Sequence, residues 1–268
     1  MSHRNTSKLM HQKLKQYTRL ISCIKSPIMA STTKIFHHSL YSTIDPSNPA
    51  NDQTGRIVLI VGASSGIGFA IAQAYIQAKA AHVILTGRRQ EALDKAITRL
   101  GRPAGSIKVT SYAFDISDES SITGMWKSLA NDHVSVKTII LNAADSRPGP
   151  VNPIQTFLPQ LRAALNTNLF AHLAMVEHFL AQTAQEGQVG PKVILNISSF
   201  MAHSNPAPFQ ATYSTSKAAL THTLQHLADE IKPEECQIIN IHPGAILTES
   251  VDNAPQEMKD AVVWDKGK

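Results

Sequence analysis

The sequence predicts a doubly wound α/β fold, with one parallel sheet covered by helices on both faces, in a single domain. Short and nearly continuous runs of Val, Ile and Leu alternate with longer stretches of helical spacing, which is typical of parallel strands buried on both faces. A glycine-rich segment follows the first apolar run and opens the first helical stretch. The length of 268 residues suits one such domain preceded by a tail.

The expected elements follow from this alternation. Strands are predicted at 57–61, 82–86, 107–112, 136–142, 192–198 and 237–242. Helices are predicted at 67–79, 90–100, 118–130, 158–184 and 213–231. In an open sheet of this kind the ligand lies outside the carboxyl ends of the strands, so residues at those ends are the candidates for function.

The turn between the first strand and the first helix predicts a phosphate-binding site. Its glycines, Gly62, Gly66 and Gly68, have the spacing G-x-x-x-G-x-G. Such a turn lets the backbone approach a pyrophosphate, whose charge then meets free N–H groups and the positive end of the helix dipole. A plain turn rich in Gly and Ser is the alternative for this segment taken alone.

A phenol and an amine are predicted to share one helix face near the end of a strand. Tyr213 and Lys217 are four residues apart in a helical stretch, so they lie side by side. The strand predicted at 192–198 ends at Ser198 and Ser199. These groups together can move a proton to or from a carbonyl oxygen, because a neighbouring cation favours the phenolate of a tyrosine that otherwise titrates near pH 10.

The order and spacing of these residues resemble the short-chain dehydrogenase/reductase family. Besides the glycine turn, the resemblance rests on Asn142, Ser199, Tyr213, Lys217 and Pro243-Gly244. It covers residues 56–248. It implies an oxidoreductase that transfers hydride between a nicotinamide cofactor and a carbonyl or secondary-alcohol group of a small molecule.

The resemblance implies a catalytic set of four residues. Tyr213 would be the general acid/base, and Lys217 would lower its pKa and hold the nicotinamide ribose. Ser199 would hydrogen-bond the substrate oxygen, and is preferred to Ser198 because the second serine of such a pair normally has this role. Asn168 would hold a water molecule in a proton relay.

The resemblance also implies the cofactor contacts. The glycine turn would contribute Gly62, Ser64, Ser65, Gly66, Ile67 and Gly68, and Tyr213 and Lys217 would also contact the cofactor. Asp115 would lie at the adenine, Asn142 beside the adenosine ribose, and Pro243, Gly244, Ile246 and Thr248 around the nicotinamide. Asp115 has a plain alternative as an N-cap or turn residue, and Pro243-Gly244 as a turn.

The end of the second strand predicts which nucleotide is used. The strand runs into Gly87-Arg88-Arg89 without an acidic residue. A carboxylate there would bind the ribose 2′-OH of NAD, whereas a guanidinium suits the 2′-phosphate of NADP. We expect NADP(H), with NAD disfavoured, and Arg88 as the contact; the alternative is that both arginines face water.

Three positions depart from the family pattern. Val61 stands where threonine is usual, Leu141 where asparagine is usual, and Ala144 where glycine is usual. The change at Leu141 removes a side chain that commonly braces the central sheet, and Ala144 adds a methyl group near the cofactor. Neither removes a catalytic group, so we expect weaker tuning and not a dead site.

Composition argues against several other classes. The formal net charge is +5, but residues 1–44 contain seven Lys or Arg and no Asp or Glu, so the excess lies in the tail and nucleic-acid binding is not expected. His222 and His226 are four residues apart but lack a third ligand, so no metal is expected. The two cysteines form no framework, which favours a reducing compartment.

Residues 1–55 are predicted to be a basic tail and linker, and 56–268 the catalytic domain. No apolar run reaches the ~18 residues of a membrane span. A disordered tail or a start at Met29 is favoured over a mitochondrial presequence, because the tail has only two arginines. We therefore expect a cytoplasmic protein, with a mitochondrial one as the alternative.

The end of the sequence predicts an incomplete site. The family normally continues after Thr248 with a segment that covers the substrate and a final strand, and here 249–268 remain. We expect strand 237–242 to be an uncovered edge, and the chain to bind cofactor weakly, turn over slowly and associate into homo-oligomers. A nucleotide-binding sensor or scaffold without turnover is the alternative, against which the intact Ser199, Tyr213 and Lys217 argue.

Overall fold

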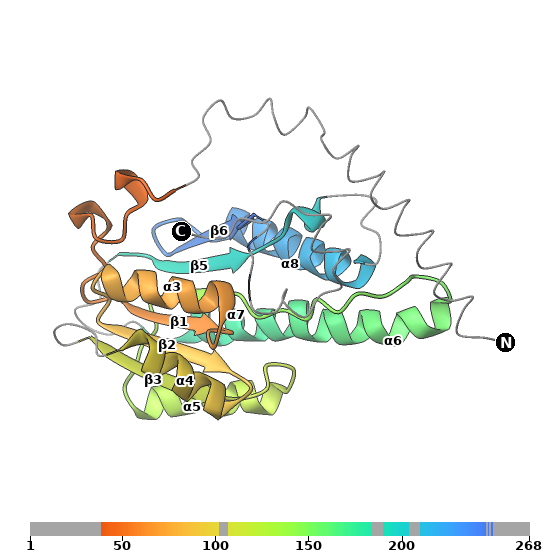
Figure 1. Cartoon of the computed structure of the whole chain (residues 1–268), viewed down its shortest axis with the longest axis horizontal. Coiled ribbons are helices and arrows are strands. Elements are labelled where there is room, and N and C mark those ends of the chain that lie inside the picture. Colours follow the sequence, from red (N-terminus) through yellow and green to blue (C-terminus); the bar gives the residue numbers. More distant parts are fainter. Residues whose placement is uncertain are drawn as a thin grey trace. The chain divides into compact units, whose positions relative to one another are not determined.

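The structure is a computed structural model that describes residues 39–101, 107–183, 190–203 and 210–244, together with residues 246 and 248. The chain divides into two compact units, and the unit Thr43–Gly244 holds the sheet (Figure 1). The sequence before residue 39 and after residue 248, on which the expectations about the tail and the missing cover depend, lies outside the described residues.

A six-stranded parallel sheet forms the centre of this unit, in the order β3-β2-β1-β4-β5-β6. The strands are β1 (Ile57–Val61), β2 (His82–Gly87), β3 (Lys108–Ala113), β4 (Thr138–Leu141), β5 (Lys192–Ile197) and β6 (Cys236–Ile241). Each predicted strand is present, and the doubly wound α/β fold is confirmed. The order reverses between β1 and β4, which places the ligand crevice of such a sheet beyond their carboxyl ends.

The helices follow the strands in turn. They are α3 (Gly66–Gln77), α4 (Gln90–Leu100), α5 (Glu119–Asn131), α6 (Ile154–Leu165), α7 (Ala171–Ala181) and α8 (Ala211–Glu230). The helix predicted at 158–184 is present as one helical stretch, made of α6, a π-helical turn and α7 and ending at Ala181. A π-helical turn, η3 (Asn166–Phe170), lies between α6 and α7. Such a turn contains one extra residue, which the spacing of apolar residues in the sequence does not reveal.

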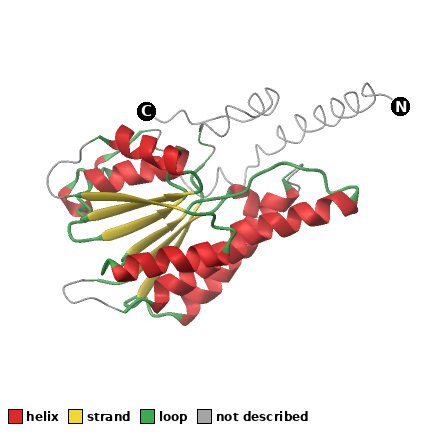
Figure 2. Cartoon of the chain, turned by 90° about the horizontal axis from the view of Figure 1, so that it is seen from below, coloured by secondary structure: helices red, strands yellow, loops and turns green. Residues whose placement is uncertain are grey.

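Two apolar cores lie on opposite faces of the sheet (Figure 2). Successive residues of β1 point to opposite faces, so Ile60 joins the core under α3 and α4, with Phe69. Leu59 joins the core under α5, α7 and α8, with Phe179 and Leu224. The burial of β1 and β4 from both sides explains why their sequences are apolar throughout.

β6 is the edge of the sheet within the described part of the chain. Cys236 and Ile238 face the core beneath α7 and α8. Ile239 and Ile241 point away from that core and are 43% and 41% exposed. Unlike β1, this strand therefore has one apolar face that no described element covers.

Lys192 joins the end of α7 to the start of β5. Its ammonium donates hydrogen bonds to the carbonyls of Phe179, Leu180 and Gln182 at 2.9, 2.9 and 3.0 Å. The last carbonyls of a helix have no partner within the helix, so this one side chain caps the end of α7.

Residues 45–55, which were predicted to link the tail to the catalytic domain, belong to the unit Thr43–Gly244. They contain a short 3₁₀ turn, η2 (Pro49–Asn51), with Asn48 as its N-cap. The amide of Gln53 donates to the carbonyl of Ala78 at the end of α3, at 2.7 Å. This segment therefore fixes the entry of the chain into β1.

Candidate active site

The glycine turn lies between the end of β1 and the start of α3, as predicted. Gly62 has φ +81°, a left-handed conformation that favours glycine. Ser65 is the extended N-cap residue of α3, but its side chain makes no capping bond, and the first turn of the helix carries no acidic residue. The positive end of the helix is thus left for an anion.

The backbone around the glycine turn is packed so closely that a side chain fits neither at Gly62 nor at Gly68. A Cβ on Gly68 would lie against the carbonyl oxygen of Gly62, well inside van der Waals contact. A Cβ on Gly62 would lie 2.9 Å from the Cα of Ala143, in the segment that follows β4. The start of α3, the end of β1 and the end of β4 therefore meet backbone to backbone.

Asn142 braces this turn. Its Nδ2 donates to the carbonyl of Gly62 at 2.6 Å. The sequence analysis placed Asn142 beside the adenosine ribose, whereas its amide points to the turn. A hydrogen bond across 80 residues of sequence could not be read from the local pattern.

Arg88 and Arg89 follow β2, and both are exposed. Arg89 is the N-cap residue of α4, whereas the charge of Arg88 acts on the carboxyl groups of Asp115 and Asp145. Asp115 accepts hydrogen bonds from the amide and hydroxyl of Ser117 at 2.9 and 2.8 Å. These bonds, followed by the charge of Arg88, hold the pKa of Asp115 below its usual value. The side chain of Asp115 therefore stabilises the turn that leads to Ser117.

The two serines after β5 have different surroundings. The Ser198 hydroxyl is buried and shares a hydrogen bond of 2.7 Å with Thr221. Ser199 is partly exposed, its hydroxyl accepts a hydrogen bond from the amide of Met201 at 3.2 Å, and the same hydroxyl lies close enough to Tyr213 to act on the pKa of the phenol. Ser199, the serine preferred from the sequence, is thus the one brought to the phenol.

Tyr213 and Lys217 lie on one face of α8, and Lys217 is 1% exposed. The Lys217 ammonium donates to the carbonyl of Ile197 at 2.7 Å and lies 5.9 Å from the centre of the Tyr213 ring. Burial raises the pKa of Tyr213, and the Ser199 hydroxyl only partly offsets this. Burial also lowers the pKa of Lys217 to about 8.

These directions differ from the sequence expectation that Lys217 lowers the pKa of the phenol. The loss of solvent is the largest cause of both shifts. At neutral pH the pair is a neutral phenol beside an ammonium, which suits donation of a proton.

Asn168 lies in the π-turn and is fully buried. Its side chain bonds the backbone of Asp145 on both sides, accepting from the amide at 2.7 Å and donating to the carbonyl at 2.8 Å. It also donates to the hydroxyl of Ser216, which in turn donates to the carbonyl of Tyr213. The side chain of Asn168 thus ties the segment after β4 to the helix that carries Tyr213.

Sequence reasoning missed three residues of this arrangement. His172 is fully buried and its Nε2 lies 2.7 Å from the carbonyl of Ala143. Ser216 immediately precedes Lys217, and its role depends on Asn168. His242 accepts from the amide of Phe200 through Nδ1 at 3.0 Å, which joins the ends of β5 and β6. Each acts across tens of residues, so no local motif marks it.

Pro243 and Gly244 follow β6 at the end of the folded unit, and Gly244 has φ +86°. Ile246 and Thr248 belong to the other unit, so their predicted contacts with the nicotinamide remain predictions.

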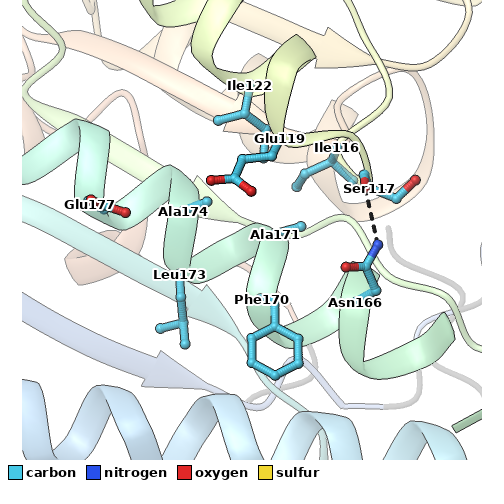
Figure 3. Close-up of a pocket in the computed structure, with 10 residues that line it drawn as sticks. All are labelled: Ile116, Ser117, Glu119, Ile122, Asn166, Phe170, Ala171, Leu173, Ala174 and Glu177. Atoms are coloured by element: carbon cyan, nitrogen blue, oxygen red, sulfur yellow. Dashed lines mark hydrogen bonds between the residues drawn. The ribbon is translucent and has the colours of Figure 1, made fainter. Parts of the chain in front are cut away.

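A hollow of about 300 Å³ lies apart from these groups (Figure 3). Its lining comes from α5, η3 and α7 and the segment before α5, with Ile122, Phe170 and Leu173 among its apolar residues. Asn166 donates to the carbonyl of Ser117 at 3.1 Å at its rim. None of the predicted catalytic residues lines it.

Within the described ranges, no helix is long and apolar enough to cross a membrane. The same part of the chain contains no group of three or more His, Cys, Asp or Glu side chains placed to hold a metal ion.

Comparison with known proteins connects this arrangement to one family. The family model for short chain dehydrogenases matches residues 56–259. The short chain dehydrogenase/reductase AacuD of Aspergillus aculeatus is 31% identical over 236 residues, which cover 87% of this chain and 78% of that protein. The short chain dehydrogenase/reductase nsrO of Aspergillus novofumigatus is 29% identical over 237 residues, with 87% and 78% covered.

Solved structures share the fold. A short chain dehydrogenase from Burkholderia cenocepacia in complex with NADP superposes with a TM-score of 0.68 at 22% identity, over 81% of this chain and 86% of that one. A short-chain dehydrogenase from Streptomyces avermitilis superposes with a TM-score of 0.62 at 28% identity, over 73% of this chain and 68% of that one.

Proposed function

Because the chain belongs to the short-chain dehydrogenase/reductase family of nicotinamide-dependent oxidoreductases, we propose that it moves hydride between NADP(H) and a carbonyl or secondary-alcohol group of a small molecule. One observation carries this proposal: Ser199, Tyr213 and Lys217 meet beyond the carboxyl end of β5. They lie at the same edge of the sheet as the glycine turn.

The glycine turn fits the pyrophosphate of a dinucleotide. The start of α3 has neither a side-chain cap nor a carboxylate in its first turn, so backbone N–H groups and the helix dipole are available to a negative charge. Ser64, Ser65 and Ile67 supply the rest of the turn. Gly62 and Gly68 keep this helix end close to β1, where any side chain would push it away.

Arg88 supports NADP over NAD. An acidic residue at the end of β2 would repel a 2′-phosphate, and this chain has Gly87 followed by two arginines there. Asp115 accepts both hydrogen bonds from Ser117 through one carboxylate oxygen, and Arg88 is exposed. A guanidinium at this place binds a phosphate with paired N–H donors.

Side chains of this protein would bind the carbonyl oxygen and supply the proton. Bound nicotinamide supplies or accepts the hydride. In reduction, Ser199 and Tyr213 hydrogen-bond the carbonyl oxygen, and the Tyr213 hydroxyl donates the proton; its raised pKa keeps that proton in place until charge develops on the oxygen. Lys217 donates one N–H to the carbonyl of Ile197, and its other two N–H donors would hold the cofactor ribose, as the family resemblance implies.

For Asn168 we propose a positioning role in addition to the relay that the family resemblance implies. Its side-chain amide forms hydrogen bonds with the backbone of Asp145 and with the hydroxyl of Ser216, so it fixes the position of α8 relative to the segment after β4. This fixes where the Tyr213 hydroxyl meets the substrate, and alignment of the reacting groups is a large part of the catalytic effect.

Titration of the full chain with NADPH and NADH, followed by nicotinamide fluorescence, tests the cofactor. We expect NADPH to bind at least about tenfold more tightly, which corresponds to about 1.4 kcal/mol. A panel of aldehydes and ketones with NADPH then tests the reaction. Equal affinity for both nucleotides contradicts the assignment of Arg88, and binding without turnover of any carbonyl contradicts the oxidoreductase proposal.

A further inference from the structure

The segment that follows β4 is held at two points, one from η3 and one from α7. Asn168 bonds the amide and carbonyl of Asp145, and His172, four residues later, bonds the carbonyl of Ala143 at 2.7 Å. Both side chains are fully buried. Together these hydrogen bonds fix the backbone of residues 143–145.

The hydrogen bond determines the chemical form of His172. A carbonyl oxygen only accepts, so Nε2 must carry the proton and donate it to Ala143. Nδ1 is then an unprotonated acceptor, and it is buried without a hydrogen-bond partner among the described residues. Burial, with the charge of Lys217 as the second cause, lowers the pKa of His172 to about 4, so the imidazole is neutral at physiological pH.

The same backbone supports the phosphate turn. Ala143 packs so tightly on Gly62 that a Cβ on the glycine would lie 2.9 Å from the Cα of Ala143. The amide of Ala143 donates to the carbonyl of Val61 at 2.8 Å, and Asn142 donates to the carbonyl of Gly62 at 2.6 Å. Residues 142–143 are thus the floor on which the turn rests.

We propose that His172 is a positioning residue for dinucleotide binding. By donating Nε2–H to Ala143, it holds the floor at 142–143 against Gly62, and so fixes the turn that receives the pyrophosphate. The inference rests on the proposed nucleotide-dependent function and adds to it a residue that touches neither cofactor nor substrate.

Two substitutions separate a positioning role from simple filling of the core. His172→Leu keeps an apolar side chain of moderate size but removes the donor, whereas His172→Gln keeps an N–H donor at similar reach. His178→Leu, on the same helix and partly buried, is the matched control because His178 contacts Trp126 and not the segment after β4. Each variant is made in the full chain.

NADPH affinity from fluorescence titration is the main measurement. We expect His172→Leu to weaken NADPH binding and raise its KM by about tenfold, with kcat at saturating NADPH changed less than about threefold. His172→Gln should recover most of that affinity, and His178→Leu should leave it unchanged. Affinity of His172→Leu equal to that of His178→Leu overturns the proposal, as does failure of His172→Gln to restore binding.

A measurement on the unaltered chain keeps the proposal testable if His172→Leu fails to fold. Nitrogen-15 NMR of the histidine rings, without cofactor at neutral pH, should show His172 protonated at Nε2 and bare at Nδ1. The other tautomer, or an imidazolium, overturns the proposal. A wild-type chain that shows this tautomer but binds neither NADPH nor NADH overturns the proposed function, and with it the role in dinucleotide binding.

Discussion

The carboxyl end of β1 and the carboxyl end of β5 lie at the same edge of one sheet but are built by different means. Beyond β1 the site is made of backbone, because Gly62, Gly68 and Ala143 meet with no room for side chains. Beyond β5 it is made of side chains, because Ser199, Tyr213 and Lys217 carry the polar groups. Space therefore limits substitutions in the first region, and chemistry limits them in the second.

This difference separates affinity from rate. A dinucleotide that rests on backbone N–H groups loses affinity when the backbone moves, whichever side chain caused the movement. Proton transfer loses rate when one hydroxyl is removed, even if nothing moves. The following predictions are arranged to test whether the two regions can be disturbed independently.

The largest effect is expected for Tyr213→Phe. Removal of the hydroxyl takes away the proton donor, so kcat should fall by about 10²–10⁴-fold. NADPH affinity should stay within a few-fold of wild type, since the turn beyond β1 is untouched. Steady-state kinetics and NADPH titration measure the two quantities; retention of more than about a tenth of the wild-type kcat would mean that another group donates the proton.

Gly68→Ala should produce the opposite pattern. The new methyl group would collide with the carbonyl of Gly62, so α3 must shift, and we expect NADPH affinity to fall about 10- to 100-fold and unfolding free energy to fall by about 1–3 kcal/mol. The rate at saturating NADPH should change less than the affinity.

Gly124→Ala in α5 is the control for that substitution, because a Cβ there meets nothing within 4 Å. It should stabilise the protein by about 0.5–1 kcal/mol and leave NADPH affinity unchanged. Urea unfolding and NADPH titration of both variants would show whether close packing at Gly68 matters; similar behaviour of the two alanines would contradict the backbone account of the first region.

Arg88→Asp tests the side chain that we expect to contribute most to NADPH affinity beyond the ends of β1 and β2. A carboxylate in place of the guanidinium should weaken NADPH by about tenfold or more and shift preference toward NADH. Arg89→Asp, at the N-cap of α4, should change NADPH affinity by less than about threefold. Dissociation constants of both nucleotides give the answer, and equal effects of the two substitutions would move the 2′-phosphate contact away from Arg88.

The smallest effect concerns stability in acid. Burial lowers the pKa of His82 in β2 and of His172 in α7 to about 4. Between about pH 6.5 and pH 4 these two histidines are protonated in the unfolded chain and neutral in the folded chain. The free energy of unfolding should therefore fall as the pH falls through this range. The loss is complete once the pH is below both values.

His82→Gln and His172→Gln should each flatten this dependence, because each removes one buried histidine whose pKa is lowered. Urea unfolding at several pH values measures the slopes. An unchanged slope in either variant would contradict burial of that histidine as a cause of the acid sensitivity.

The sequence predicted the strands well because burial on both faces leaves a plain apolar signal, as in β1 and β4. It also identified the residues that the structure brings together beyond β5, since Tyr213 and Lys217 belong to one helix. It did not predict the π-turn at Asn166–Phe170, because one extra residue hardly changes an apolar pattern. The place of Asn142 and the role of His172 depend on partners 80 and 29 residues away, which only folding brings together.

Lys192 has a consequence for how this chain can vary. One ammonium binds three carbonyls at the end of α7, which joins that helix directly to the start of β5. We expect the connection between Gln182 and Lys192 to accept insertions, deletions or a fused peptide tag without displacing Asn168 or Ser199. For an engineer, this makes it the place to attach a label, and for evolution a place where relatives can differ in length at little cost.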